Sequence, residues 1–174
     1  MGHADIAIRR LGEADAARFR AIRLDALTHH PHDFGASVAD EAAAELDAFA
    51  DMLRRNAVFG ALAGDRLLGV VAFYQQAGEK LSHKGVIWGV YVCHEARRQG
   101  LARGLIGAVL AHAGTLVELV QLTVTLANEP ARALYRSLGF VDYGLEERAL
   151  KFADRYVDEA LMVKFLTPRV EDRQ

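Results

Sequence analysis

The sequence is poor in cysteine, since Cys93 is the only one among its 174 residues. One cysteine excludes an internal disulfide, and its rarity is typical of a reducing compartment. No apolar run reaches the roughly 20 residues that a membrane-spanning helix needs. The first residues lack the basic and apolar segments of a signal peptide. We therefore expect a cytoplasmic protein that has no membrane partner.

A surplus of either charge is also missing. The chain has 21 Lys and Arg residues against 23 Asp and Glu, a formal net charge of −2. A general nucleic-acid binder would need a basic surplus to meet the phosphates, so no nucleic-acid partner is expected. No internal repeat or low-complexity linker is visible, which predicts a single domain over residues 1–174.

Several common site patterns are absent as well. The sequence contains no P-loop, no dinucleotide-binding glycine pattern, no G-x-S-x-G and no H-E-x-x-H. His29, His30 and His32 lie close together, but they flank Pro31 in a predicted loop. Zinc ligands usually converge from fixed elements together with a carboxylate or a thiolate. We expect no metal here.

Hydrophobic periodicity predicts alternating strands and helices over the length of the chain. The expected strands are 6–10, 58–63, 67–74, 86–92, 121–126, 140–144 and 156–166, and the expected helices are 15–27, 40–55, 102–116 and 130–138. Residues 145–155 are interpreted as a charged connector. Hairpins at both ends, with strand–helix–strand crossovers between them, predict an α+β fold. This would be a mixed α/β sheet with helices on both faces.

The most informative stretch is residues 86–106, where a buried strand, a short polar turn and a helix follow one another. The turn contains Arg97, Arg98, Gly100 and Ala102. Small residues allow an anion to approach the backbone, and the first N–H groups of a helix are free to bind it. The arginines add positive charge and forked donors. The pattern predicts a phosphate-binding turn.

Two segments resemble the motifs of one enzyme family. Residues 97–102, Arg-Arg-Gln-Gly-Leu-Ala, match the signature [RQ]-x-x-G-x-[GA] of the GNAT superfamily of acyl-CoA-dependent N-acetyltransferases. Residues 128–140, Asn-Glu-Pro-Ala-Arg-Ala-Leu-Tyr-Arg-Ser-Leu-Gly-Phe, are similar to its N-x-x-A-x-x-L-Y-x-x-x-G-F element. The resemblance implies a GNAT-like three-layer fold. Its twisted sheet would have about six or seven mostly antiparallel strands, with a strand splay at the CoA site.

The same resemblance implies acetyl-CoA as cosubstrate and assigns residues to it. The turn would bind the pyrophosphate, and the main chain at the end of strand 86–92 would bind the pantetheine arm and polarise the thioester carbonyl. Asn128 would contact the cofactor from the end of the next strand. The expected cofactor-binding residues are Val90, Tyr91, Val92, Arg97, Arg98, Gln99, Gly100, Leu101, Ala102, Arg103 and Asn128.

Tyr135, in the second motif, is the expected catalytic residue. A phenol with a pKa of about 10 can protonate a departing thiolate, whose pKa is about 8.5 if it resembles cysteine. The alternative is that Tyr135 only packs on the helix face that carries Ala131, Leu134 and Leu138. The surrounding motif favours the catalytic role.

The general base and the acceptor site are less defined. Some members of the superfamily have a glutamate five residues before the asparagine, where this chain has Thr123. His83 and Glu79 are alternatives, as is a water chain, and the base stays unassigned. Phe34, His83 and Trp88 are the candidate substrate-binding residues.

The motifs predict transfer of an acetyl group from acetyl-CoA to a primary amine, by direct attack on the thioester. A small-molecule amine is the favoured acceptor, and a protein or peptide N-terminus is the alternative. A non-catalytic acyl-CoA-binding module is the alternative from another class. A monomer or a homodimer fits the sequence equally well.

Overall fold

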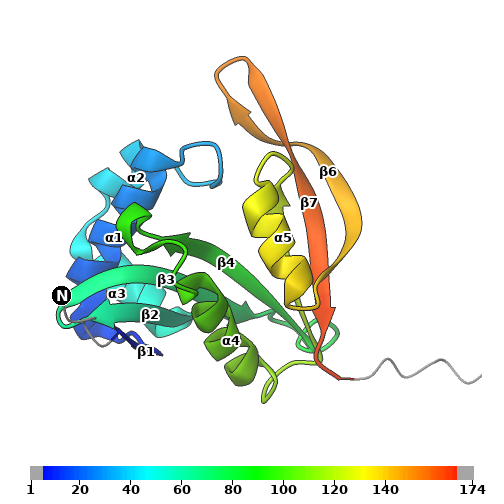
Figure 1. Cartoon of the computed structure of the whole chain (residues 1–174), viewed down its shortest axis with the longest axis horizontal. Coiled ribbons are helices and arrows are strands. Elements are labelled where there is room, and N and C mark those ends of the chain that lie inside the picture. Colours follow the sequence, from blue (N-terminus) through cyan, green and yellow to red (C-terminus); the bar gives the residue numbers. More distant parts are fainter. Residues whose placement is uncertain (1–5, 168–174) are drawn as a thin grey trace, which may run out of the picture. The chain divides into compact units, whose positions relative to one another are not determined.

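The computed structural model describes residues 6–167. The elements are β1 (Ile6–Arg10), η1 (Glu13–Asp15), α1 (Ala16–His29), α2 (Val38–Ala43), α3 (Leu46–Arg55), β2 (Ala57–Ala63), β3 (Arg66–Gln75), β4 (Lys84–Val92), η2 (His94–Ala96), α4 (Leu101–Ala113), β5 (Leu119–Thr125), α5 (Glu129–Ser137), β6 (Val141–Phe152) and β7 (Arg155–Phe165). Seven strands form one sheet in the order β1-β2-β3-β4-β5-β7-β6 (Figure 1). Within residues 6–167, no helix is long and apolar enough to cross a bilayer.

The expected mixed, mostly antiparallel sheet with helices is confirmed. β1–β2, β2–β3, β5–β7 and β6–β7 pair in antiparallel fashion, and β4–β5 pair in parallel. Two compact units are distinguishable, residues 6–74 with 87–110 and residues 75–86 with 111–167. The single domain over 1–174 and the splay between β4 and β5 stay predictions. Residues 1–5 and 168–174 lie outside the described part.

In the first unit, helices cover both faces of the strands because β3 alternates. Val70 and Ala72 belong to the core cluster that α1 and α3 complete, where the rings of Phe19 and Phe49 meet edge to face at 6.2 Å. Gly69, the residue before Val70, has the opposite orientation and faces α4: a Cβ there would lie 2.9 Å from Leu105 Cδ1. Successive side chains of β3 point to opposite faces of the sheet, so one face packs against α1 and α3 and the other against α4.

The predicted helix 40–55 is wrong as one helix, because the chain breaks between α2 and α3. Ala44 and Glu45 are extended, with ψ of 139° and 156°. On one continuous helix Glu41 and Phe49 would lie about 80° apart around the axis. The break lets the Glu41 carboxylate turn inward to Arg23 while Phe49 stays in the core. Tertiary packing outweighs the local helix propensity here.

In the second unit, β5, β7 and β6 pair side by side and α5 covers one face (Figure 1). Asp142 lies opposite Met162 in the register, so both side chains point to the same face. Arg136 of α5 donates to the Asp142 carboxylate at 3.0 Å. This contact identifies the Met162 face as the one beneath α5.

The predicted connector 145–155 is wrong, since those residues are the tip of a long β6–β7 hairpin. Leu145 pairs with Ala160 and Phe152 with Arg155, with an irregularity between Glu146 and Leu150. Most of β6 is exposed. A strand without a buried face shows no hydrophobic alternation, so its charges resemble those of a loop.

Candidate active site

Arg97 links the turn after β4 to the strand end. Its Nε donates to the Val92 carbonyl at 3.0 Å, and its Nη2 lies 2.7 Å from His30 Nε2. The guanidinium also lies over the Tyr91 ring, 5.8 Å from the centroid. Three residues therefore fix this arginine, which places its positive charge beside the main chain of the predicted pantetheine-binding residues.

In the backbone of the turn, the sign of φ alternates from one residue to the next, as it does in an anion-binding nest. Arg98 and Gly100 have positive φ of 63° and 78°, while Gln99 between them does not. Alternation of this kind turns successive N–H groups toward one side. α4 then begins with the Gly104 N–H bound to the Gly100 carbonyl at 3.0 Å, and the N–H groups of residues 101–103 precede that first helical bond. This geometry suits a phosphate group.

A partly buried polar pair, Tyr91 and Asp25, lies beside the strand end. The Tyr91 hydroxyl donates to Asp25 Oδ2 at 2.8 Å, and the Cys93 thiol lies 3.9 Å from the same oxygen. Burial, followed by the Asp25 carboxylate, raises the pKa of both Tyr91 and Cys93. A thiol with a raised pKa is a poor nucleophile near neutral pH. The site therefore does not favour an acyl-cysteine intermediate.

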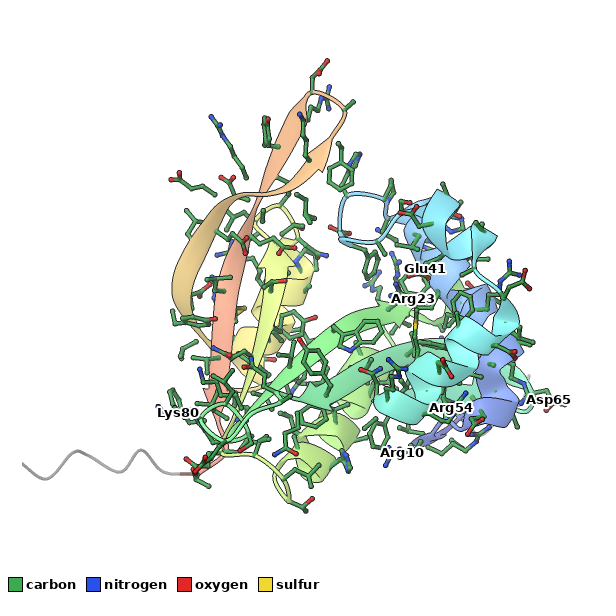
Figure 2. All side chains as sticks on the ribbon, turned by 180° about the vertical axis from the view of Figure 1, so that it is seen from behind. Arg10, Arg23, Glu41, Arg54, Asp65 and Lys80 are labelled. Atoms are coloured by element: carbon green, nitrogen blue, oxygen red, sulfur yellow. The ribbon has the colours of Figure 1, made fainter. Side chains whose placement is uncertain are left out.

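Arg23 and Glu41 form an ion pair beside β4 that the sequence did not reveal. The two side chains point toward one another from α1 and α2, and both are almost fully buried (Figure 2). Arg23 also lies over the Trp88 ring at 5.4 Å. Gly89 has φ of 62°, and a Cβ there would lie 3.2 Å from Arg23 Nη1. No spacing rule connects residues 18 positions apart, so only the fold brings them together.

Two of the three predicted substrate-binding residues share one apolar cluster. Phe34 and Trp88 are partly buried against the core of the first unit, and Trp88 Nε1 donates to Asn56 Oδ1 at 3.3 Å. His83 belongs to the second unit and immediately precedes β4. Its carbonyl accepts the N–H of Glu118 at 2.8 Å. Val92 stands at the opposite end of that strand.

The second motif forms a capped helix in the second unit. Asn128 Oδ1 accepts the N–H of Ala131 at 3.2 Å and so caps the start of α5. Tyr135 is 6% exposed and its ring meets Phe140 edge to face at 5.8 Å. The tyrosine is thus packed as well as polar, and its predicted role stays a prediction.

Glu159 on β7 is a partly buried carboxylate that sequence reasoning did not single out. Thr125 lies directly opposite it and Thr123 lies diagonally, so the three side chains share the face opposite α5. The Thr123 hydroxyl donates to the Glu159 carboxylate. Burial raises the pKa of Glu159, as does Glu146, while the Thr123 hydrogen bond lowers it. The strand was predictable, but the register that joins Glu159 to Thr123 was not.

No group of three or more His, Cys, Asp or Glu side chains in residues 6–167 is arranged to hold a metal ion. Of the histidine run, His30 faces Arg97 and lies 3.3 Å from Asp33 Oδ2 through its Nδ1.

Comparison with known proteins identifies the family of this fold and turn. The model of the Acetyltransferase (GNAT) family matches residues 21–140. The chain belongs to this family. Membership makes it an acetyl-CoA-dependent N-acetyltransferase, in agreement with the two motifs. No curated protein matches the sequence.

Solved structures of GNAT proteins share the fold at low sequence identity. An acetyltransferase of the GNAT family from Streptococcus pneumoniae has a TM-score of 0.83 at 21% identity, covering 94% of this chain and 100% of that one. The Salmonella typhimurium acetyltransferase yncA, determined with its cofactor acetyl-CoA, has a TM-score of 0.83 at 17% identity, covering 96% and 97%. The ribosomal-protein-S18-alanine N-acetyltransferase from Escherichia coli has a TM-score of 0.72 at 19% identity, covering 98% and 99%. Identities this low establish the fold alone.

The GNAT match includes the turn 97–103 and Tyr135, whereas Glu159 lies beyond its last residue. The family pattern thus accounts for the predicted cofactor side of the site.

Proposed function

We propose that this GNAT protein acetylates a primary amine by direct attack on the thioester of acetyl-CoA, with Tyr135 as general acid. A small-molecule amine is the preferred acceptor. The observation that carries the proposal is the turn 97–100, whose left-handed residues lead directly into α4 within the family match. The cytoplasm stays the proposed compartment, because a single cysteine is typical of a reducing environment.

The residues of the turn fit a pyrophosphate. Residues 98–103 offer successive N–H groups and a helix start, and Gly100 has open space on its Cβ side. In the proposal, Val90, Tyr91 and Val92 bind the pantetheine arm through their main chain, and Asn128 contacts the cofactor. The bound cosubstrate supplies an activated acetyl thioester.

Tyr135 is proposed to donate its phenolic proton to the departing thiolate. Its ring is fixed by burial and by Phe140, which limits the entropy lost when the hydroxyl is aligned. A buried phenol at a fixed position is suited to general acid catalysis. Packing alone would need no hydroxyl, and this difference can be tested.

The acceptor would meet Phe34 and Trp88, which are partly buried against one core cluster. Partial burial limits the apolar surface available to a long peptide, and this favours a small amine. The alternative, acetylation of a protein or peptide N-terminus, is supported by the names of two structural neighbours. These are the Escherichia coli enzyme and a ribosomal-protein-alanine N-acetyltransferase from Brucella melitensis, which is 24% identical with a TM-score of 0.77.

The test is transfer from labelled acetyl-CoA to a panel of acceptors. The panel contains polyamines, amino-acid amides and aminoglycosides, together with peptides that begin with alanine. Preference for a small amine supports the proposal, and preference for the peptides supports the alternative. Tight CoA binding without transfer to any acceptor would support the non-catalytic module and overturn the proposal.

The role of Tyr135 is tested by Tyr135→Phe, which keeps the contact with Phe140. We expect kcat to fall by about 100-fold or more, with an unchanged Kd for CoA, because only the acid is lost. Tyr156→Phe is the matched control, since Tyr156 is half-exposed on β7 and its loss of a hydroxyl should leave kcat unchanged. Equal turnover in both variants would show that Tyr135 only packs.

A further inference from the structure

The proposed reaction requires a proton acceptor that the motifs do not supply. A primary amine with a pKa near that of lysine, about 10, is protonated at neutral pH and is not nucleophilic until it loses a proton. Thr123 has no basic group. The neighbouring strand supplies one, because β7 places Glu159 beside Thr123 in the sheet.

The sheet register fixes this arrangement. Thr123 pairs with Leu161 and Thr125 with Glu159, so Glu159 is the diagonal neighbour of Thr123 on the same face. Diagonal neighbours lie about 7–8 Å apart, within reach of a long side chain. Thr123 acts on Glu159 as a hydrogen-bond donor, which favours the charged form of the carboxylate. A glutamate on β7 thereby presents its carboxylate at the β5 position where Thr123 stands.

The surroundings of Glu159 differ from those of two other carboxylates in the second unit, Glu129 and Asp142. Glu129 and Asp142 are each bound by an arginine of α5. Among residues 6–167, no lysine or arginine forms an ion pair with Glu159. Its charged neighbour is Glu146 on β6, directly opposite, and β5 offers it the uncharged Thr123 and Thr125. An unneutralised carboxylate can both attract a cation and accept its proton.

We propose that Glu159, oriented by Thr123, is the general base that deprotonates the acceptor ammonium. This inference rests on the proposed function, and it adds that the acceptor binds as a cation between Glu159 and Glu146. It requires the acceptor nitrogen to lie at β5 near Thr123, on the face opposite α5.

The proton balance of the reaction is complete with two residues. Glu159 takes the first proton from the ammonium and passes it to solvent. The amine then forms the C–N bond at the thioester carbonyl, and the C–S bond breaks as the tetrahedral intermediate collapses. Tyr135 protonates the departing thiolate, and the second proton of the nitrogen returns to the Tyr135 phenolate. The products are the amide, CoA and one proton.

The partial burial of Glu159 strengthens it as a base. Burial and the Glu146 charge raise its pKa above that of an ordinary glutamate, which strengthens the carboxylate as a proton acceptor. The group stays a base only above that pKa, so kcat/KM should fall as the pH drops through it. The acidic limb of the pH profile thus reports on Glu159.

The primary test is Glu159→Gln, assayed with the panel amine that gives the highest turnover. We expect kcat to fall about 100-fold or more, loss of the acidic limb, and an unchanged Kd for CoA. The control is Asp154→Asn, which removes a carboxylate at the tip of the same hairpin. This variant should leave turnover unchanged. The same assay is repeated with methoxyamine, a weakly basic amine that is already neutral at pH 7. Because it needs no prior deprotonation, Glu159→Gln should retain most of the wild-type rate with it.

Substitutions at two neighbours of Glu159 should shift the acidic limb of the pH profile in opposite directions. Thr123→Val removes a hydrogen bond that stabilises the carboxylate, so the limb should move to higher pH. Glu146→Gln removes a like charge, so the limb should move to lower pH. A residue that only supported the fold would not produce these opposite shifts.

Each outcome decides the proposal. Wild-type rate and an unchanged pH profile in Glu159→Gln would overturn Glu159 as the base, while transfer to the amine would leave the proposed function intact. Equal losses with methoxyamine and the basic amine would also overturn it, because the variant would then have lost more than proton transfer. If the wild-type protein acetylates no amine, the inference falls with the proposed function. If Glu159→Gln does not fold, the limb shifts of Thr123→Val and Glu146→Gln decide.

Discussion

The Nε2 atom of His30 lies 2.7 Å from Nη2 of Arg97. An arginine side chain has donors only, so Nε2 of the imidazole must accept. The proton of the neutral ring is then on Nδ1, which lies 3.3 Å from Asp33 Oδ2. The loop after α1 therefore helps to hold the arginine that begins the predicted phosphate-binding turn.

His30→Leu should weaken CoA binding, because Arg97 loses the acceptor that fixes its orientation. A hydrogen bond to a charged group contributes about 1.5 kcal/mol, so we expect Kd to rise roughly tenfold in calorimetry. His30→Gln retains an acceptor and should lose less. His32→Leu, exposed in the same loop, is the control. Equal affinities for all three variants would show that His30 does not position Arg97.

The turn itself can be tested at Gly100, where φ is 78°. Asparagine tolerates this conformation and nearly matches aspartate in shape, so the pair Gly100→Asn and Gly100→Asp isolates the charge. We expect a loss of CoA affinity within about fivefold for the asparagine and of about 100-fold or more for the aspartate, which places a negative charge at a helix start. Similar affinities for the two variants would contradict a phosphate site in this turn.

Gly89→Ala should destabilise the fold on two grounds. Its φ of 62° disfavours a side chain, and its Cβ would crowd Arg23 Nη1 at 3.2 Å. We expect the free energy of unfolding to fall by about 1–3 kcal/mol in urea. Gly107→Ala is the opposite control: it lies in α4 with open space around it, and alanine should add about 0.5–1 kcal/mol. Gains for both variants would contradict the crowding at Arg23.

Asp15 should make stability depend on pH below the neutral range. Its carboxylate accepts hydrogen bonds from Arg9 at 2.8 Å and from the Gly12 N–H at 3.0 Å, and the Arg9 bonds above all lower its pKa. A folded-state pKa below the unfolded value of about 3.9 stabilises the protein above that value, and this stabilisation is lost as the pH falls further.

Asp15→Asn should therefore cost about 2 kcal/mol of unfolding free energy at pH 7, and the difference from wild type should shrink toward pH 2. Urea unfolding over a pH series measures it. Arg18 forms ion pairs with both Asp15 and Asp65. The Asp65 side chain is 97% exposed, so Asp65→Asn should cost less than about 1 kcal/mol. A pH-independent difference for Asp15→Asn would contradict the linkage.

Local sequence predicted the parts of the structure that depend on neighbours in the chain. The strand before the turn and the glycine at the start of α4 follow from patterns only a few residues long. The break between α2 and α3 does not, because it depends on Arg23, 18 residues before Glu41.

The candidate site also contains residues that local motifs predict and residues that only the fold brings together. The turn 97–103 and Tyr135 belong to motifs with fixed spacing, so the sequence alone identified them. Glu159 and Thr123 are 36 positions apart and meet through the register of β5 and β7, which no motif encodes. A register one residue different would have turned Glu159 to the other face of the sheet.

β6 ends the strand order, so one of its edges has no strand beside it in the described sheet. Val141, Tyr143 and Leu145 are about half exposed there, a composition that invites another chain to add as a further strand. The register shifts beside Asp142 and between Glu146 and Leu150, with Arg148 at φ 55°, interrupt the regular ladder of this strand. An incoming strand could pair with only short segments of β6. The irregular hairpin therefore disfavours edge-to-edge aggregation.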